Sequence, residues 1–206
     1  MHIITISREF GSGGRELGKR LADLLECDYY DSEIITAVAC ESGLDPHYVE
    51  KKLGDHGWQN LPITFWSTLG SAAYMQSSQV QLLLEQKKVL ENIAALGKDC
   101  VIVGRNADTI LAAWEPFRLF VCAGEKEKLC RCRERAPEEE RLSDKELLRK
   151  IKQVDKARAR TREILSGSSW GQRDAYELIV NTSGWEIKEL APVVKGFAKS
   201  WFGRKQ

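Results

Sequence analysis

The stretch that decides the fold is Ile3–Leu17, which reads IITISREFGSGGREL. It opens with four β-branched residues, a run typical of a buried strand. A glycine-rich loop follows, and leucines at helical spacing then predict an amphipathic helix over residues 15–26. Glycines let backbone N–H groups turn toward phosphate oxygens, and a helix start adds further N–H donors. The order strand, loop and helix therefore predicts a phosphate-binding site. A glycine-rich turn without a ligand is the alternative.

The loop departs from the common phosphate-loop pattern GxxxxGK[ST]. In the register that agrees with the strand and the helix, Glu9 replaces the first glycine, Arg15 the lysine and Glu16 the hydroxyl residue. Arg15 still offers a permanent positive charge for phosphate. The metal ligands stay unknown, with Glu16 as the candidate for contact with magnesium, directly or through water. A second register, ending at Gly18-Lys19, is rejected because it delays the helix and removes a leucine from its apolar face.

Apolar runs alternate with helical patterns along the rest of the chain. Strands are predicted at residues 3–6, 100–104, 119–122 and 178–180, with 28–31 as a short strand or turn. Further helices are predicted at 33–41, 46–54, 78–96 and 185–201. Such alternation predicts an α/β fold, a parallel sheet of about five strands flanked by helices. We expect one domain over residues 1–206, with 31–97 and 124–165 as insertions on its core.

Composition narrows the class of protein. Of the 206 residues, 43% are hydrophobic and 30% are charged, which suits one globular domain of ordinary size. No apolar run approaches the roughly 20 residues that span a bilayer, and the start lacks the features of a signal peptide. The six cysteines form no CxxC pair, so we expect them to be reduced. These observations predict a cytoplasmic protein with no membrane partner.

The net charge of +1 argues against binding of long nucleic acids, but the charge is unevenly spread. Residues 124–165 hold 14 Lys and Arg against ten Asp and Glu, so this arm carries +4 and the remainder −3. One interpretation is an arm that closes over a polyanion such as a nucleoside triphosphate, since the arginine fork suits phosphate oxygens. The other is a solvated, salt-bridged helical hairpin.

Several motifs together resemble the cytidylate kinase-like family, a divergent branch of the P-loop nucleoside monophosphate kinases. The resemblance rests on Ser7–Arg15, Tyr30-Asp31-Ser32, Gly104-Arg105-Asn106, Phe120–Ala123 followed by Arg131, Asp155-Lys156-Ala157-Arg158, Trp170, Tyr176 and Asn181-Thr182-Ser183. It implies a P-loop NTPase-type sheet with a helical acceptor-binding insert at 31–97 and a lid at 124–165. It also implies transfer of the γ-phosphoryl group of ATP, with Mg²⁺, to a nucleoside monophosphate, foremost CMP or dCMP.

The same resemblance implies roles for individual residues. The donor phosphates would be held by Gly11, Ser12, Gly13, Gly14, Arg15 and Glu16. The acceptor would be contacted by Asp31, Ser32, Arg105 and Asn106. The catalytic set would be Arg15, Arg158, Arg131 and Asp155. Within it, Arg158 and Arg131 would neutralise charge on the transferred group or stack near the donor base, and Asp155 would orient Arg158 or the acceptor.

Departures from the family pattern keep alternatives open. Asn106 stands where the cytidylate kinases have aspartate, Ala37 where they have an arginine, and Cys132 where they have the second of two arginines. A kinase of the same fold for another small acceptor, or a nucleotide-binding protein with weak or no kinase activity, are the other hypotheses. The expected partners are ATP and a small phosphorylated acceptor. The aromatic residues of 55–78 leave a homodimer open.

Overall fold

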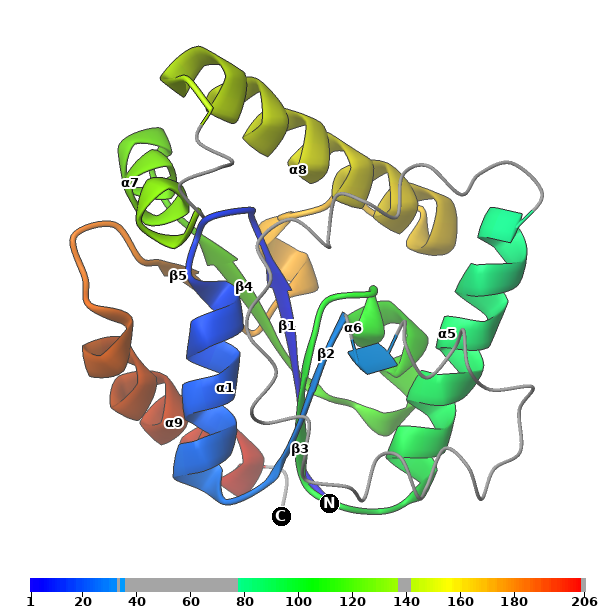
Figure 1. Cartoon of the computed structure of the whole chain (residues 1–206). Helices are drawn as coiled ribbons and strands as arrows, with labels where there is room; N and C mark the ends of the chain where they lie inside the picture. Colours follow the sequence, from blue (N-terminus) through cyan, green and yellow to red (C-terminus); the bar gives the residue numbers. More distant parts are fainter. Residues whose placement is uncertain (33, 36–77, 137–141, 205–206) are drawn as a thin grey trace.

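The computed structural model describes residues 1–32, 34–35, 78–136 and 142–204 (Figure 1). The helix predicted at 46–54 and almost all of the aromatic stretch 55–78 lie outside these residues. Of the helix predicted at 33–41, only residues 34 and 35 are described, and both are helical.

Five parallel strands form the sheet. They are β1 Ile3–Arg8, β2 Asp28–Asp31, β3 Cys100–Val103, β4 Phe117–Cys122 and β5 Leu178–Asn181, in the order β2-β3-β1-β4-β5. The expected parallel α/β sheet is confirmed, and the doubtful segment 28–31 is a strand. β1 continues two residues past its predicted end, which brings Arg8 to the carboxyl edge of the sheet.

The described residues also form α-helices. They are α1 Gly14–Leu25, α5 Ser78–Ala95, α6 Ala107–Ile110, α7 Glu125–Arg135, α8 Asp144–Ser166 and α9 Ile187–Gly203. The start of α8 shows how local sequence sets a boundary. Ser143 accepts a hydrogen bond from the Glu146 backbone N–H, and the Glu146 carboxylate accepts one from the backbone N–H of Ser143. This capping box satisfies two N–H groups that the helix itself leaves unbonded.

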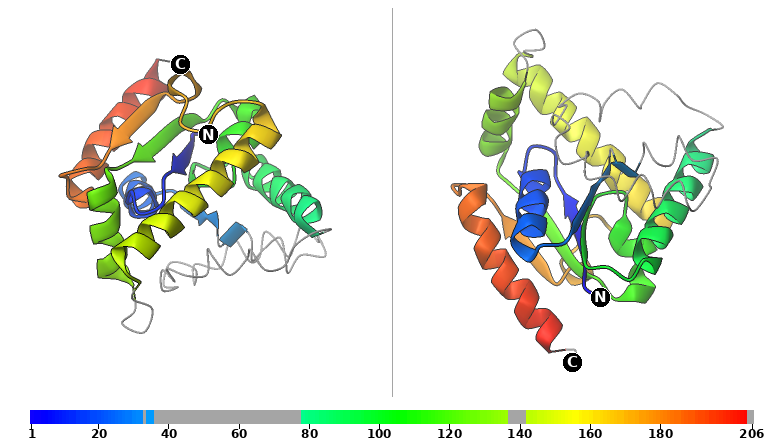
Figure 2. Two further views of the ribbon diagram at one scale, coloured as in Figure 1. Left: turned by 90° about the horizontal axis from the view of Figure 1, so that it is seen from above. Right: turned by 60° about the horizontal axis from the view of Figure 1, so that its bottom comes forward.

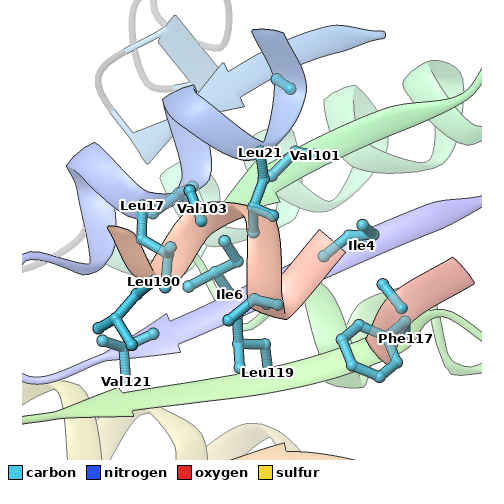
Figure 3. Packing of buried hydrophobic residues seen from close by; sticks show 14 of the residues in the cluster. Ile4, Ile6, Leu17, Leu21, Val101, Val103, Phe117, Leu119, Val121 and Leu190 are labelled. Carbon is cyan, nitrogen blue, oxygen red and sulfur yellow. The ribbon is translucent and has the colours of Figure 1, made fainter. Parts of the chain in front are cut away.

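Alternation along the strands divides the core between the two faces of the sheet. Ile4 and Ile6 face α1 and α9, where they pack with Leu17, Leu21 and Leu190 (Figure 3). The neighbouring residue Ile3 belongs to the opposite cluster, with residues of α5 and α6. Both faces are covered, and the inner strand β3, with the sequence CVIV, is accordingly apolar and buried along its whole length. Figure 1 shows α1 and α9 on one side of the sheet and α5 and α6 on the other.

The two helices of the basic arm lie at the carboxyl ends of the strands. Figures 1 and 2 show α8 passing over this edge of the sheet, above the loop that follows β1. Exposed ion pairs link α8 to its neighbour α7, between Arg133 and Asp144 and between Lys152 and Glu125. The interpretation as a salt-bridged helical hairpin is thus confirmed for the described residues of 124–165, and closure over a polyanion stays a prediction. In the described part of the chain, no helix is long and apolar enough to cross a bilayer.

β1 is the central strand, with β3 on one side of it and β4 on the other. After β1 the chain adds β2 and β3 on one side of this strand, and it then crosses over to add β4 and β5 on the other side. The loop after β1 therefore lies where the order of the strands reverses direction. Open α/β sheets bind ligands at this point, outside the carboxyl ends of the strands. The topology therefore places the candidate site between the loop after β1, the ends of β2 and β3, and α8.

Candidate functional site

The loop after β1 has the backbone of an anion cradle. Gly11 and Gly13 have φ angles of 76° and 80°, a left-handed conformation that favours glycine. Gly13 is the N-cap of α1 and contributes no side-chain cap, so the first N–H groups of that helix can serve a ligand. Gly18 lies inside α1, where an added Cβ would sit 2.5 Å from a methyl carbon of Val103. The helix begins at Gly14, as the register that ends at Arg15 requires, and Gly18 is a packing residue.

Arg15 lies between the loop and the end of β2. Its Nη2 is 2.5 Å and its Nε 2.8 Å from the same oxygen, Oδ2 of Asp31. The other carboxylate oxygen of Asp31 accepts a hydrogen bond from the backbone N–H of Ile34 at 3.1 Å. A residue expected on the donor side and one expected on the acceptor side are thus in direct contact.

Two further arginines meet at Ser32, which follows β2. Arg8 donates from Nη2 to the Ser32 hydroxyl at 3.2 Å. Arg105 donates from Nε and Nη2 to the Ser32 carbonyl, both at 3.4 Å. Ser32 therefore does more than begin a helix, because it gathers guanidinium groups from the ends of β1 and β3.

The turn after β3 is shaped to admit Arg8. Three successive residues, Gly104, Arg105 and Asn106, have φ angles of 89°, 55° and 51°. A Cβ on Gly104 would lie 1.9 Å from Nη1 of Arg8, so only glycine leaves room for this guanidinium. Left-handed backbone at non-glycine residues is unfavourable and concentrates at functional sites. Asn106 acts here through its carbonyl, which accepts from the N–H groups of Thr109 and Ile110 at the start of α6.

Asp155 and Arg158 reach the loop from α8. Asp155 Oδ1 accepts from the backbone N–H of Phe10 at 2.7 Å and lies 3.5 Å from Nη1 of Arg158. The same Arg158 nitrogen donates to the Arg8 carbonyl at 3.0 Å. Asp155 therefore orients Arg158, and it also holds the start of the phosphate loop.

The site is strongly positive. Four guanidinium groups, those of Arg8, Arg15, Arg105 and Arg158, face two carboxylates, those of Asp31 and Asp155. Burial lowers the pKa of Arg158 to about 9, and the charges of Arg8 and Arg105 act in the same direction, with Asp155 partly offsetting them. Arg158 stays protonated at neutral pH, at a cost in free energy that a bound anion would offset. Desolvation raises the pKa of Asp155.

Glu16 makes ion pairs instead of facing an open position. Its Oε1 accepts from Nε of Arg20 at 2.9 Å, and its Oε2 pairs with the guanidinium of Arg135 on α7. Among the described residues, no group of three His, Cys, Asp or Glu side chains could hold a metal ion. Glu16, the candidate for contact with magnesium, is thus held by two arginines.

The Arg131 guanidinium is held by hydrogen bonds to three residues. It donates to the carbonyls of Ser12, Thr182 and Trp185 and to the Thr182 hydroxyl, at 2.8 to 3.3 Å. Ser12 itself is buried, with its hydroxyl bound to the Glu9 carbonyl at 2.8 Å. The structure therefore places Arg131 against the phosphate loop.

Sequence reasoning missed two cations of the site, Arg8 and Lys128. Arg8 carried a usable signal, because it directly follows a buried strand and precedes the glycine loop, at the sheet edge where ligands bind. Lys128 is buried on α7 and pairs with Glu9 (Nζ–Oε2, 2.5 Å), with Asp155 Oδ2 at 3.7 Å. Its spacing of three and seven residues from Arg131 and Arg135 indicates a shared helix face.

The sequence profile of the cytidylate kinase-like family matches residues 3–184, from the start of β1 to just beyond β5. The chain belongs to the cytidylate kinase-like family. The match includes the phosphate loop, the turn after β3 and both helices of the basic arm. No curated protein matches the sequence.

Solved structures share the fold of this cytidylate kinase-like protein. An uncharacterized protein from Eubacterium ventriosum has a TM-score of 0.71 at 22% identity, covering 97% of this chain and 99% of that one. A shikimate kinase from Acinetobacter baumannii in complex with shikimate has a TM-score of 0.51 at 14% identity, with coverages of 97% and 94%. A shikimate kinase from Bacteroides thetaiotaomicron has a TM-score of 0.52 at 14% identity, with coverages of 96% and 98%. The fold is that of the P-loop kinases.

Proposed function

We propose that this cytidylate kinase-like protein transfers the γ-phosphoryl group of ATP to a nucleoside monophosphate, with CMP and dCMP as the first candidates. The observation that carries the proposal is the group of four arginines, Arg8, Arg15, Arg105 and Arg158, between the phosphate loop and Ser32. Phosphoryl transfer between two nucleotides brings several phosphate groups together. Guanidinium groups suit this, because they bind phosphate oxygens in pairs and never lose their charge at neutral pH.

The geometry suggests a division of work along the site. The backbone N–H groups of Gly11–Gly14 and the start of α1 would hold the β- and γ-phosphates of the donor. Arg8 and Arg105, which meet at Ser32, would bind the phosphate of the acceptor. Arg158 lies between these two regions, beside the Arg8 carbonyl, and would neutralise charge on the transferred group. This reaction needs alignment and charge stabilisation, and no covalent nucleophile.

Mg²⁺ would enter as part of the MgATP substrate, bound mainly by phosphate and water oxygens as is usual for this ion. It would neutralise and orient the donor phosphates. The helix α8, which passes over the loop, would help to exclude water that would otherwise hydrolyse ATP (Figure 2). We place the protein in the cytoplasm, where ATP and nucleoside monophosphates are available.

Two other functions keep specific support. A different small acceptor is favoured by the shikimate kinases among the structural neighbours, since guanidinium groups bind carboxylate as well as phosphate. A nucleotide-binding protein without transferase activity is favoured by Glu16, which replaces the usual hydroxyl residue and is held by Arg20 and Arg135.

One assay separates the three functions. ADP release from MgATP is measured with CMP, dCMP, UMP, AMP, GMP or shikimate as acceptor, for the wild type and for Arg105→Gln and Arg133→Gln. Arg133 is the matched control, because it lies on α7 in an exposed ion pair with Asp144. Stimulation by CMP or dCMP, lost in Arg105→Gln and kept in Arg133→Gln, supports the proposal. Stimulation by shikimate alone supports the second function. ATP binding without stimulation by any acceptor supports the third.

A further inference from the structure

One face of α7 contacts the phosphate loop at three successive points. Lys128, Arg131 and Arg135 are three and four residues apart, so their side chains share a face of the helix. Lys128 pairs with Glu9 at the start of the loop, Arg131 donates to the Ser12 carbonyl in its middle, and Arg135 pairs with Glu16 at its end.

Between these cations the loop lies directly against the helix. A Cβ on Gly11 would be 2.9 Å from Sγ of Cys132 and 3.0 Å from the carbonyl oxygen of Lys128, so no side chain fits there. The ring of Phe10 is buried in an apolar cluster with Cys132 and with Leu147 and Ile151 of α8. The loop is thus held by apolar packing as well as by charge.

The acceptors of Arg131 show what this residue does. Its Nη1 donates to the Ser12 carbonyl and the Thr182 hydroxyl, and its Nη2 to the carbonyls of Thr182 and Trp185. The Thr182 hydroxyl also donates to the Ser12 carbonyl at 2.7 Å, and Thr182 is completely buried. Arg131 therefore ties the middle of the loop to the segment between β5 and α9.

We infer that α7 positions the phosphate loop through Lys128, Arg131 and Arg135, and that Arg131 is a positioning residue instead of a catalytic one. This assigns Arg131 a role other than the charge neutralisation that family resemblance suggests. Lys128 and Arg135 are each neutralised by a glutamate of the loop segment, so they fix its shape and add little net charge. A loop fixed in advance needs no reorganisation when phosphate binds. The part of the inference that concerns nucleotide binding rests on the proposed function.

The first measurement needs no nucleotide. Amide hydrogen exchange of residues 10–14 is compared in the wild type, Arg131→Gln, Arg131→Lys, Arg135→Gln and the control Arg133→Gln. We expect the exchange rate to rise roughly ten-fold or more in both Arg131 variants. Neither glutamine nor lysine, each with a single donor nitrogen, can replace the four hydrogen bonds that arginine donates from two nitrogens. Arg135→Gln, which loses a partly exposed pair, should raise it about two- to five-fold. Arg133→Gln should leave it unchanged. Wild-type exchange rates in Arg131→Gln and Arg135→Gln would overturn the inference.

The second measurement separates positioning from catalysis. ADP affinity is measured by calorimetry, and kcat and KM for ATP are measured with the acceptor found above. A positioning role predicts that Arg131→Lys weakens ADP binding and raises KM for ATP roughly ten-fold. A fall in kcat with ADP affinity and loop exchange unchanged would make Arg131 catalytic and refute the inference. If the wild type binds no nucleotide, the proposed function fails, and the exchange measurement still decides the role of α7.

Discussion

The guanidinium of Arg15 and the carboxylate of Asp31 are in contact, with Nη2 2.5 Å from Oδ2. Arg15 belongs to the first turn of α1, and Asp31 is the last residue of β2, so this ion pair joins the regions that we propose for the donor and for the acceptor. Asp31 is buried, and its other oxygen is held by the Ile34 N–H. The carboxylate therefore fixes the direction of Arg15, and a bound phosphate would share that guanidinium with it.

Removing the side chain of Arg15 should abolish ATP binding or turnover. Arg15→Ala takes away the cation that stands in the lysine position and removes an ion-pair partner of the buried Asp31. Calorimetry with ADP and the ADP-release assay measure the two effects. Lys19→Ala is the matched control, because Lys19 would be the phosphate cation in the rejected register. Intact binding and turnover in Arg15→Ala would reduce Arg15 to a structural partner of Asp31.

Glu16 should not act as a ligand of magnesium. Both of its oxygens pair with arginines, Arg20 and Arg135, so a metal would have to displace a guanidinium. We expect Glu16→Gln to change the ratio of ADP affinities with and without Mg²⁺ by less than about two-fold, since the ion takes its ligands from phosphate and water. Titration calorimetry measures the ratio. If this ratio fell ten-fold or more in Glu16→Gln but not in Arg135→Gln, Glu16 would be a ligand of the metal.

The sheet and the phosphate loop could be predicted because their signals are local. The β-branched run Ile3–Ile6, the glycines and the leucines of α1 each act over a few residues, and they agree with one another. The contacts of Arg131 could not be found in this way. Ser12 and Thr182 lie 119 and 51 residues away, and only the packing of α7 brings them together. The helical spacing of Lys128, Arg131 and Arg135 could have indicated a common face, but it does not say what that face contacts.

A buried ion pair anchors α8 one turn beyond Arg158. Arg162 pairs with Asp108 of α6, both residues are buried, and the guanidinium carbon of Arg162 lies 5.1 Å from the centre of the Tyr176 ring. Arg162→Met should lower the free energy of unfolding by about 3–5 kcal/mol, because it leaves the charge of Asp108 buried without its partner. Urea denaturation measures the loss.

The comparison for that variant is Arg133→Met, which breaks the exposed pair with Asp144. Exposed ion pairs contribute little to stability, so Arg133→Met should change the free energy of unfolding by no more than about 1 kcal/mol. Equal losses in the two variants would show that Arg162 does not anchor α8. Loss of nucleotide binding in Arg162→Met, at a temperature where it is folded, would connect this anchor to the position of Arg158.

Filling the space beside Gly104 should affect binding of the acceptor more than it affects the stability of the protein. Gly104→Ala places a methyl group 1.9 Å from the present position of Arg8 Nη1, which is the end of a flexible side chain and can move away. Gly97 is the matched control, since its φ is also positive, at 71°, and nothing lies within 4 Å of an added Cβ. Both alanine variants should lose about 1–2 kcal/mol of stability from left-handed backbone alone.

Only Gly104→Ala should also raise the KM for the acceptor, because the displaced guanidinium of Arg8 leaves Ser32 and the acceptor phosphate. Steady-state kinetics of both variants measure this difference. In an Arg8→Ala background the same Gly104→Ala change should raise KM little further, since the group that it displaces is already gone. A full additive effect in the double variant would mean that Gly104 acts through the turn of Arg105 and Asn106 and not through Arg8.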